Sequence, residues 1–122
     1  IVRGVCSIVP RKNLYIKSIV GRFLEHNRIY YFRNGGSPEY YISSADLLTR
    51  NLDKRVETLI SLKDSKVVKQ LEWMIKVYKE DQKNSFIMDE NGKWKHASGN
   101  FSCHEWFIKH SDIKKERKKW KK

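Results

Sequence analysis

Two aromatic segments joined by a glycine-rich turn constrain the fold of this chain more than any other feature. Residues 28–33 read RIYYFR, residues 34–38 read NGGSP and residues 39–43 read EYYIS. Aromatic and β-branched side chains favour strands, and asparagine, glycine and proline between two such runs are typical of a tight turn. The sequence therefore predicts an antiparallel β-hairpin at this point.

The first half of the chain carries the other long runs of strand-forming residues. Short apolar or alternating runs predict strands at residues 2–9, 15–20 and 55–62. Residues 21–25 could form one helical turn before the hairpin. The first half is thus expected to be mainly β.

The second half changes to helical spacing. Apolar residues recur on one helix face over residues 65–80, where Asp64 or Ser65 can serve as N-cap, and a second helix is predicted at residues 103–119. Between them, residues 86–88 and 93–96 flank an Asp-Glu-Asn-Gly turn and predict a second hairpin. With no repeat and no linker, this order predicts a single α/β unit.

Composition limits the range of partners. A chain of 122 residues suffices for one domain with one core, and a net charge of +12, from 26 basic and 14 acidic side chains, points to an anionic partner. Residues 114–122 supply half of that charge, either as a solvated helix end or as a polyanion-binding tail. No membrane-spanning run or signal peptide is recognisable. Cys6 and Cys103 are expected to be reduced thiols of a cytosolic protein, and the start at Ile1 indicates a piece of a longer one.

One histidine lies among several arginines. His26 is flanked by Arg22 and Arg28, and Arg50 and Arg55 follow beyond the hairpin. Imidazole can exchange a proton or a phosphoryl group near neutral pH, and guanidinium groups bind phosphate oxygens. The group therefore predicts a site for chemistry on phosphate.

Other residues near this group are candidates with simpler alternatives. Ser43 and Ser44 could offer hydroxyls to phosphate, or Ser44 or Asp46 could merely cap a short helix that follows. Arg3 lies in an apolar strand and needs an anion or a carboxylate beside it. No phosphate-cradling glycine loop is present, and the other histidines lack the spacing of a zinc site.

Three segments of the chain resemble the last domain of the bacterial polyphosphate kinase family, which makes polyphosphate from ATP through a phosphorylated histidine. They read VRGVCSIVP, IKSIVGRFLEHNRIYYFRNGG and YISSADLLTRNLDKRVE. The resemblance is specific over residues 1–62 and looser beyond them. It implies an α/β fold, a phospholipase D-like domain with a mixed β-sheet flanked by helices. Residues 1–122 would be part of the second such domain, with a basic tail at residues 113–122.

The resemblance also implies roles for individual residues. Arg3 matches the arginine of the family's V-R-G-x-C segment, which contacts ATP, and His26 matches the histidine of its F/Y-L-E-H-x-R segment, at the nucleotide phosphates. His26 would assist the transfer, either as an acid or only as a hydrogen-bond donor. Further candidate contacts to phosphate or polyphosphate are Arg22, Arg28, Ser43, Ser44, Arg50 and Arg55. The phosphorylated histidine belongs to a preceding domain, so the isolated chain is expected to be inactive.

Cofactors and partners follow from the same resemblance. Mg²⁺ would enter with ATP and be held by residues outside this chain. The ligands would be ATP, ADP and inorganic polyphosphate, and the partners the preceding domains of the enzyme and further copies of it. No nucleic acid is expected. The location would be cytoplasmic, with membrane association of the full-length enzyme as an alternative.

Two other functions fit parts of the sequence. The basic charge and four tryptophans would suit a nucleic-acid-binding module, but no recognised binding motif is present. A phospholipase D-like phosphodiesterase half-site would need lysine two residues after histidine and an aspartate downstream. Arg28 and Arg33 stand at those positions instead.

Overall fold

A computed structural model describes residues 14–110 of the chain, and these residues divide between two compact units. One unit consists of residues 23–76, and the other contains residues 14–22 and 77–110. The predicted strand at residues 2–9, with Arg3, and the basic tail lie outside the described residues.

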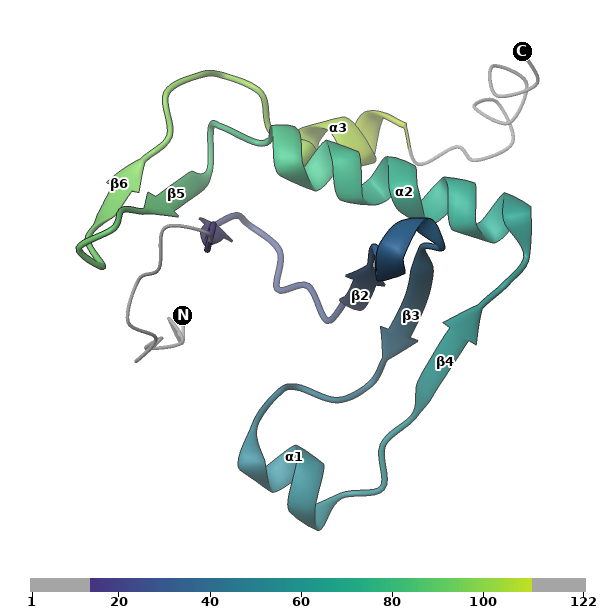
Figure 1. Cartoon of the computed structure of the whole chain (residues 1–122). Helices are drawn as coiled ribbons and strands as arrows, with labels where there is room; N and C mark the ends of the chain where they lie inside the picture. Colours follow the sequence, from purple (N-terminus) through teal and green to yellow (C-terminus); the bar gives the residue numbers. More distant parts are fainter. Residues whose placement is uncertain (1–13, 111–122) are drawn as a thin grey trace. The chain divides into compact units, whose positions relative to one another are not determined.

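The unit of residues 23–76 is built on a three-stranded antiparallel sheet (Figure 1). Its strands are β2 (Arg28–Phe32), β3 (Glu39–Ser43) and β4 (Leu59–Leu62), in the order β2-β3-β4. Strands β2 and β3 form the hairpin that the sequence predicted, with Arg28 opposite Ser43 and Phe32 opposite Glu39. The strand predicted at residues 55–62 is confirmed, although its hydrogen-bonded part starts only at Leu59.

The hairpin turn depends on its glycines. A short 3-10 helix, η1 (Asn34–Gly36), joins the two strands, and all three of its residues have positive φ, 42° at Asn34, 61° at Gly35 and 108° at Gly36. Most residues with a Cβ rarely adopt such φ angles, whereas glycine, and to a lesser degree asparagine, adopts them readily. The NGG sequence thus fixes the turn and, with it, the register of the hairpin.

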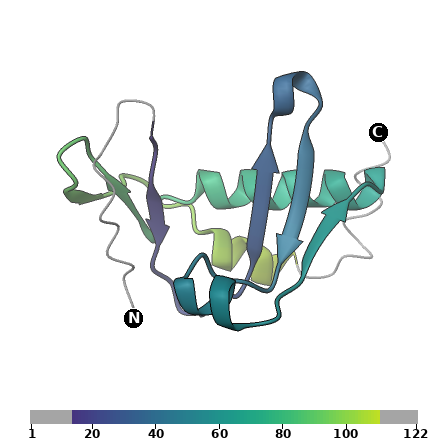
Figure 2. The ribbon, with the colours of Figure 1, turned by 60° about the horizontal axis from the view of Figure 1, so that its bottom comes forward.

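Helix α2 (Ser65–Glu80) covers one face of this sheet (Figure 2). The predicted bounds are confirmed, and so is the cap, because Oδ1 of Asp64 accepts hydrogen bonds from the backbone nitrogens of Lys66 and Val67 at 2.9 and 3.1 Å. On the covered face, Tyr40 of β3 is buried and its hydroxyl donates to Oε1 of Glu72 in α2 at 2.6 Å. This contact holds the middle strand against the helix.

The other unit contains a second small sheet and a short helix. Strands β1 (Lys17–Ile19), β5 (Ser85–Met88) and β6 (Trp94–His96) pair antiparallel in the order β1-β5-β6, and α3 (Cys103–Lys109) follows. The second hairpin is therefore confirmed, in a sheet of its own. Lys17 donates from Nζ to the backbone oxygens of Tyr78, Lys79 and Asp81, at 3.4 and 2.6 Å for the first two, and so caps the end of α2.

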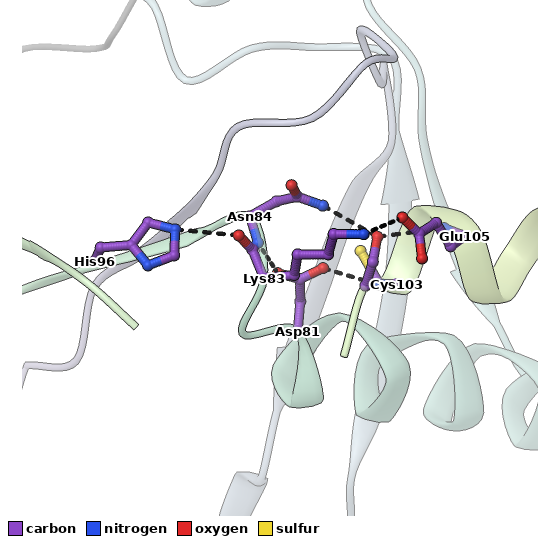
Figure 3. Close-up of polar contacts among 7 residues, drawn as sticks. Asp81, Lys83, Asn84, His96, Cys103 and Glu105 are labelled. Atoms are coloured by element: carbon purple, nitrogen blue, oxygen red, sulfur yellow. Dashed lines mark hydrogen bonds and ion pairs between the residues drawn. The ribbon is translucent and has the colours of Figure 1, made fainter. Parts of the chain in front are cut away.

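A buried carboxylate organises the same unit (Figure 3). Asp81 is fully enclosed and accepts hydrogen bonds from the backbone nitrogens of Asn84 and Cys103, at 3.1 and 2.7 Å, and from the hydroxyl of Ser85 at 2.8 Å. Burial raises the pKa of Asp81, but these hydrogen bonds outweigh it, and the pKa lies below its ordinary value. Asp81 thus ties the end of α2 to β5 and to the start of α3.

The α/β class is confirmed, with antiparallel pairing throughout the described residues. The helical turn expected at residues 21–25 is wrong, because these residues form a bend at Arg22 and Phe23 and no helix. A Cβ on Gly21 would collide with the ring of His104, so the close packing within this unit leaves room only for glycine at this position. Cys103 is buried and forms no disulfide bond within residues 14–110.

Candidate functional site

The register of the hairpin gathers the predicted site residues of the unit 23–76 at one end of the β2-β3-β4 sheet. Arg28 begins β2, and Ser43 ends β3 directly opposite it. The segments before Arg28 and after Ser43 therefore lie at the same end of the sheet. Helix α1 (Thr49–Lys54) lies at this end too, away from η1 (Figure 2). Within residues 23–76, the part of the sequence that suggested phosphate chemistry therefore lies at one end of the sheet.

His26 is an exposed side chain two residues before β2. It interacts electrostatically with Asp46, which lies in the segment between β3 and α1. No hydrogen bond of its ring to the described residues is seen, so the imidazole is available to a ligand. A contact of this imidazole with phosphate stays a prediction.

Arg28 is held by a carboxylate. Its side chain is 18% exposed, Nε donates to Oδ1 of Asp46 at 2.7 Å, and Nη2 donates to the same oxygen. Asn51 of α1 also hydrogen-bonds the Asp46 carboxyl. Chiefly because of the Arg28 hydrogen bonds, the pKa of Asp46 lies below its ordinary value, so the carboxylate is charged at neutral pH.

This group has two enclosed polar atoms without partners among the described residues, Nη1 of Arg28 and Oδ1 of Asn51. Buried polar atoms are nearly always hydrogen-bonded, and leaving one unpaired costs about 1–3 kcal/mol. Asn51 itself is only 3% exposed. The network of Arg28, Asp46 and Asn51 is therefore incomplete within residues 14–110.

The two serines are engaged locally. Oγ of Ser43 accepts from the backbone nitrogen of Ala45 at 3.0 Å. Oγ of Ser44 accepts from the backbone nitrogen of Thr58 at 3.0 Å and donates to Oε2 of Glu57. Their hydroxyls thus hold the turn after β3 beside the start of β4.

Three further predicted arginines, Arg22, Arg50 and Arg55, are exposed. Arg50 lies in α1 and Arg55 directly follows it. Neither forms an ion pair within the part of the chain that the structure describes. Arg22 is exposed in the other unit, and Arg3 lies outside the described residues. Of the six candidate phosphate contacts, Arg50 and Arg55 have exposed guanidinium groups that form no hydrogen bond or ion pair with residues 14–110.

Sequence reasoning missed the role of Asp46 and Asn51. The helix cap proposed for Asp46 or Ser44 is wrong, because α1 begins at Thr49 after Leu48, and no side chain caps it. The missed signal is the hairpin itself. Once Arg28 is paired with Ser43, Asp46 is the nearest acidic residue after β3.

Metal-binding side chains are not clustered here. Among residues 14–110, no group of three or more His, Cys, Asp and Glu side chains could hold a metal ion. The described residues therefore do not fit a resident metal site. No helix in this range has the length and apolarity needed to cross a membrane.

Comparison with known proteins gives consistent results. Residues 1–104 match the family described as polyphosphate kinase C-terminal domain 2. The polyphosphate kinase of Pseudomonas aeruginosa is 40% identical over 80% of this chain and 15% of its own length, and that of Dictyostelium discoideum is 46% identical over 80% and 10%. The crystal structure of polyphosphate kinase from Porphyromonas gingivalis superimposes with a TM-score of 0.73 at 28% identity, covering 87% of this chain and 17% of that one. The chain thus spans less than a fifth of the relatives it matches.

Proposed function

Because the chain belongs to the family of polyphosphate kinase C-terminal domains, we propose that it forms part of the active site of an enzyme that transfers the γ-phosphoryl group of ATP to polyphosphate. The observation that carries the proposal is the exposed His26 beside the charged network of Arg28 and Asp46. The reaction would be reversible, with ATP or ADP and inorganic polyphosphate as ligands.

In the proposed reaction, a histidine of a preceding domain attacks the γ-phosphorus of ATP. A bond from phosphorus to nitrogen forms, the bond from phosphorus to the β–γ bridging oxygen breaks, and ADP leaves. The terminal oxygen of a polyphosphate chain then attacks the same phosphorus, a bond from phosphorus to that oxygen forms, and the bond from phosphorus to nitrogen breaks, which frees the histidine. Neither step needs a nucleophile from the described residues.

His26 would act on the leaving oxygen of ADP. An imidazole at this position can donate a hydrogen bond or a proton to the oxygen as negative charge builds up on it. Its exposure and its lack of a hydrogen-bond partner among residues 14–110 support this role. Arg3 would bind the ATP phosphates, a role that rests on the resemblance of its V-R-G-x-C segment to that of the family.

The exposed arginines would bind phosphate groups of the polyphosphate that lie further from the reacting phosphorus. Arg50 and Arg55 carry unoccupied guanidinium groups at the His26 end of the sheet, and Arg22 precedes His26 in the sequence. Arginine binds phosphate through two parallel hydrogen bonds, which suits a repeating polyanion. Contacts from Ser43 and Ser44 would require these hydroxyls to exchange their present partners.

Magnesium would arrive with the nucleotide and neutralise phosphate charge, held by residues outside those described. The preceding domains of the enzyme, and further copies of it, would complete the assembly. A cytoplasmic location remains a prediction of the sequence.

A competition experiment tests the substrate class. The chain would be bound to a fluorescent polyphosphate, and unlabelled polyphosphate or single-stranded oligonucleotide of equal charge would be added at constant salt. We expect polyphosphate to displace the probe at least tenfold more effectively. Equal displacement would favour the nucleic-acid-binding alternative, because binding to both would then be set by charge alone.

A further inference from the structure

Asp46 lies beside the segment that carries His26 and contacts it. Its carboxylate receives two hydrogen bonds from the Arg28 guanidinium and one from Asn51, so it connects the first residue of β2 with α1. It also interacts electrostatically with His26, two residues before Arg28. Asp46 therefore interacts with both His26 and Arg28, the two residues that the sequence placed at the phosphate site.

The ion pair of Arg28 with Asp46 is partly buried. The Arg28 side chain is 18% exposed and Asp46 is 33% exposed, whereas the ion pair of Lys83 with Glu105 in the other unit is 48% and 54% exposed. Exposed ion pairs fix their side chains weakly, and partly buried pairs with several hydrogen bonds fix them well. Arg28 is consequently held in one orientation at the start of the strand.

Asp46 serves no competing local purpose that would explain this arrangement. It does not cap α1, whose N-cap residue is Leu48, and the turn after β3 is held by Ser43 and Ser44. Arg28 donates hydrogen bonds from two of its three nitrogens to Asp46, close in sequence to the proposed catalytic histidine. Such an arrangement is typical of residues that do not touch the substrate but orient the group that does.

We propose that Asp46 is a positioning residue for phosphoryl transfer, which acts through Arg28 to fix the backbone segment that presents His26. The inference rests on the proposed function. Arg28 then acts mainly as the anchor of this segment, and Asn51 keeps the Asp46 carboxylate in place. No bond is made or broken at Asp46.

The test uses a full-length polyphosphate kinase carrying this sequence at the corresponding position. Polyphosphate synthesis would be measured for the wild type, Asp46→Asn, Arg28→Met and the double variant. We take the loss known for the hydrogen-bond partners of metal ligands, about 10–100-fold in activity, as the scale for a residue that orients a reacting group. We expect each single variant to lose kcat by about this factor, with the KM for ATP within twofold of the wild type, and the double variant to lose no more than the worse single variant.

Asp53→Asn is the matched control, since it removes an equal charge from the exposed face of α1 and should leave kcat unchanged. A kcat of Asp46→Asn within twofold of the wild type, or single losses that multiply in the double variant, would overturn the proposal. If Asp46→Asn does not fold, Asp46→Glu decides, because it keeps the charge and changes the placement. A reduced kcat at unchanged KM then supports positioning, and wild-type kcat overturns it. An inactive wild type would instead contradict the proposed function itself.

Discussion

The hydroxyl of Tyr40 in β3 donates a 2.6 Å hydrogen bond to Oε1 of Glu72 in α2. Tyr40 is 6% exposed, so this bond forms at the border of the apolar layer between sheet and helix. Strand β3 ends in Ser43 at the candidate site. The contact therefore stabilises the element from which the site residues after β3 are presented.

Removal of the Tyr40 hydroxyl should destabilise the protein. Tyr40→Phe keeps the ring and loses the hydrogen bond to a charged acceptor, which we expect to lower the free energy of unfolding by about 1–2 kcal/mol. Tyr41→Phe is the control, because the Tyr41 hydroxyl bonds to the exposed Glu39 on the opposite face of β3. Urea denaturation of both variants measures the difference. Equal stability of the two would contradict the packing described for Tyr40.

The same contact predicts an alkaline transition. Hydrogen bonding to Glu72 raises the pKa of Tyr40 from 10.0 to about 12. The folded state thus keeps the proton more tightly than the unfolded state, and the stabilisation is complete below pH 10 and is lost as the pH rises towards 12. Absorbance titration of tyrosinate should show a late-titrating residue that disappears in Tyr40→Phe. Its persistence in that variant would assign the late titration to another tyrosine.

Lys17 should contribute more stability than its exposed counterpart Lys83. Lys17 caps the carboxyl end of α2 through three backbone oxygens, where the helix dipole favours a positive charge. We expect Lys17→Met to cost about 1–2 kcal/mol. Lys83→Met removes only an exposed ion pair with Glu105 and should cost less than about 1 kcal/mol. Thermal unfolding that ranks the two variants in the reverse order would refute the cap.

Asp81 should make the protein sensitive to acid. Its folded-state pKa lies below the ordinary value near 3.8, because the hydrogen bonds from Cys103, Ser85 and Asn84 outweigh burial. The charged form is therefore the one that stabilises the fold, fully above the unfolded-state pKa, and this contribution shrinks as the pH falls below about 4. Denaturation between pH 2.5 and pH 6, roughly spanning that pKa, should give a steeper pH dependence for the wild type than for Asp81→Asn. Parallel curves would show that Asp81 is not the responsible group.

Local sequence patterns were sufficient where one short segment decides the structure. The NGG turn between two aromatic runs predicted the β2–β3 hairpin, and apolar spacing with Asp64 as cap predicted α2 at its observed bounds. Local patterns failed where contacts between residues far apart in the sequence determine the structure. Gly21 packs against the ring of His104, more than eighty residues away, and no local pattern contains that contact.

The candidate site shows the same division. His26 and the arginines were recognisable by type, because imidazole and guanidinium groups suit phosphate. The pairing of Arg28 with Asp46 was not, because it requires the register of β2 with β3 and the course of the turn after Ser43. Asp46 looked like a helix cap in sequence, and only the start of α1 at Thr49 excludes that role.

The most direct test of the central claim is polyphosphate formation from ATP by a full-length enzyme carrying this sequence, compared with its His26→Ala variant and with the chain of 122 residues alone. We predict that the full-length protein forms acid-insoluble polyphosphate, that His26→Ala remains folded but loses at least about 100-fold in rate, and that the isolated chain is inactive. Wild-type rates in His26→Ala, or polyphosphate synthesis by the isolated chain, would contradict the assignment of this domain as a part of the active site that acts through His26.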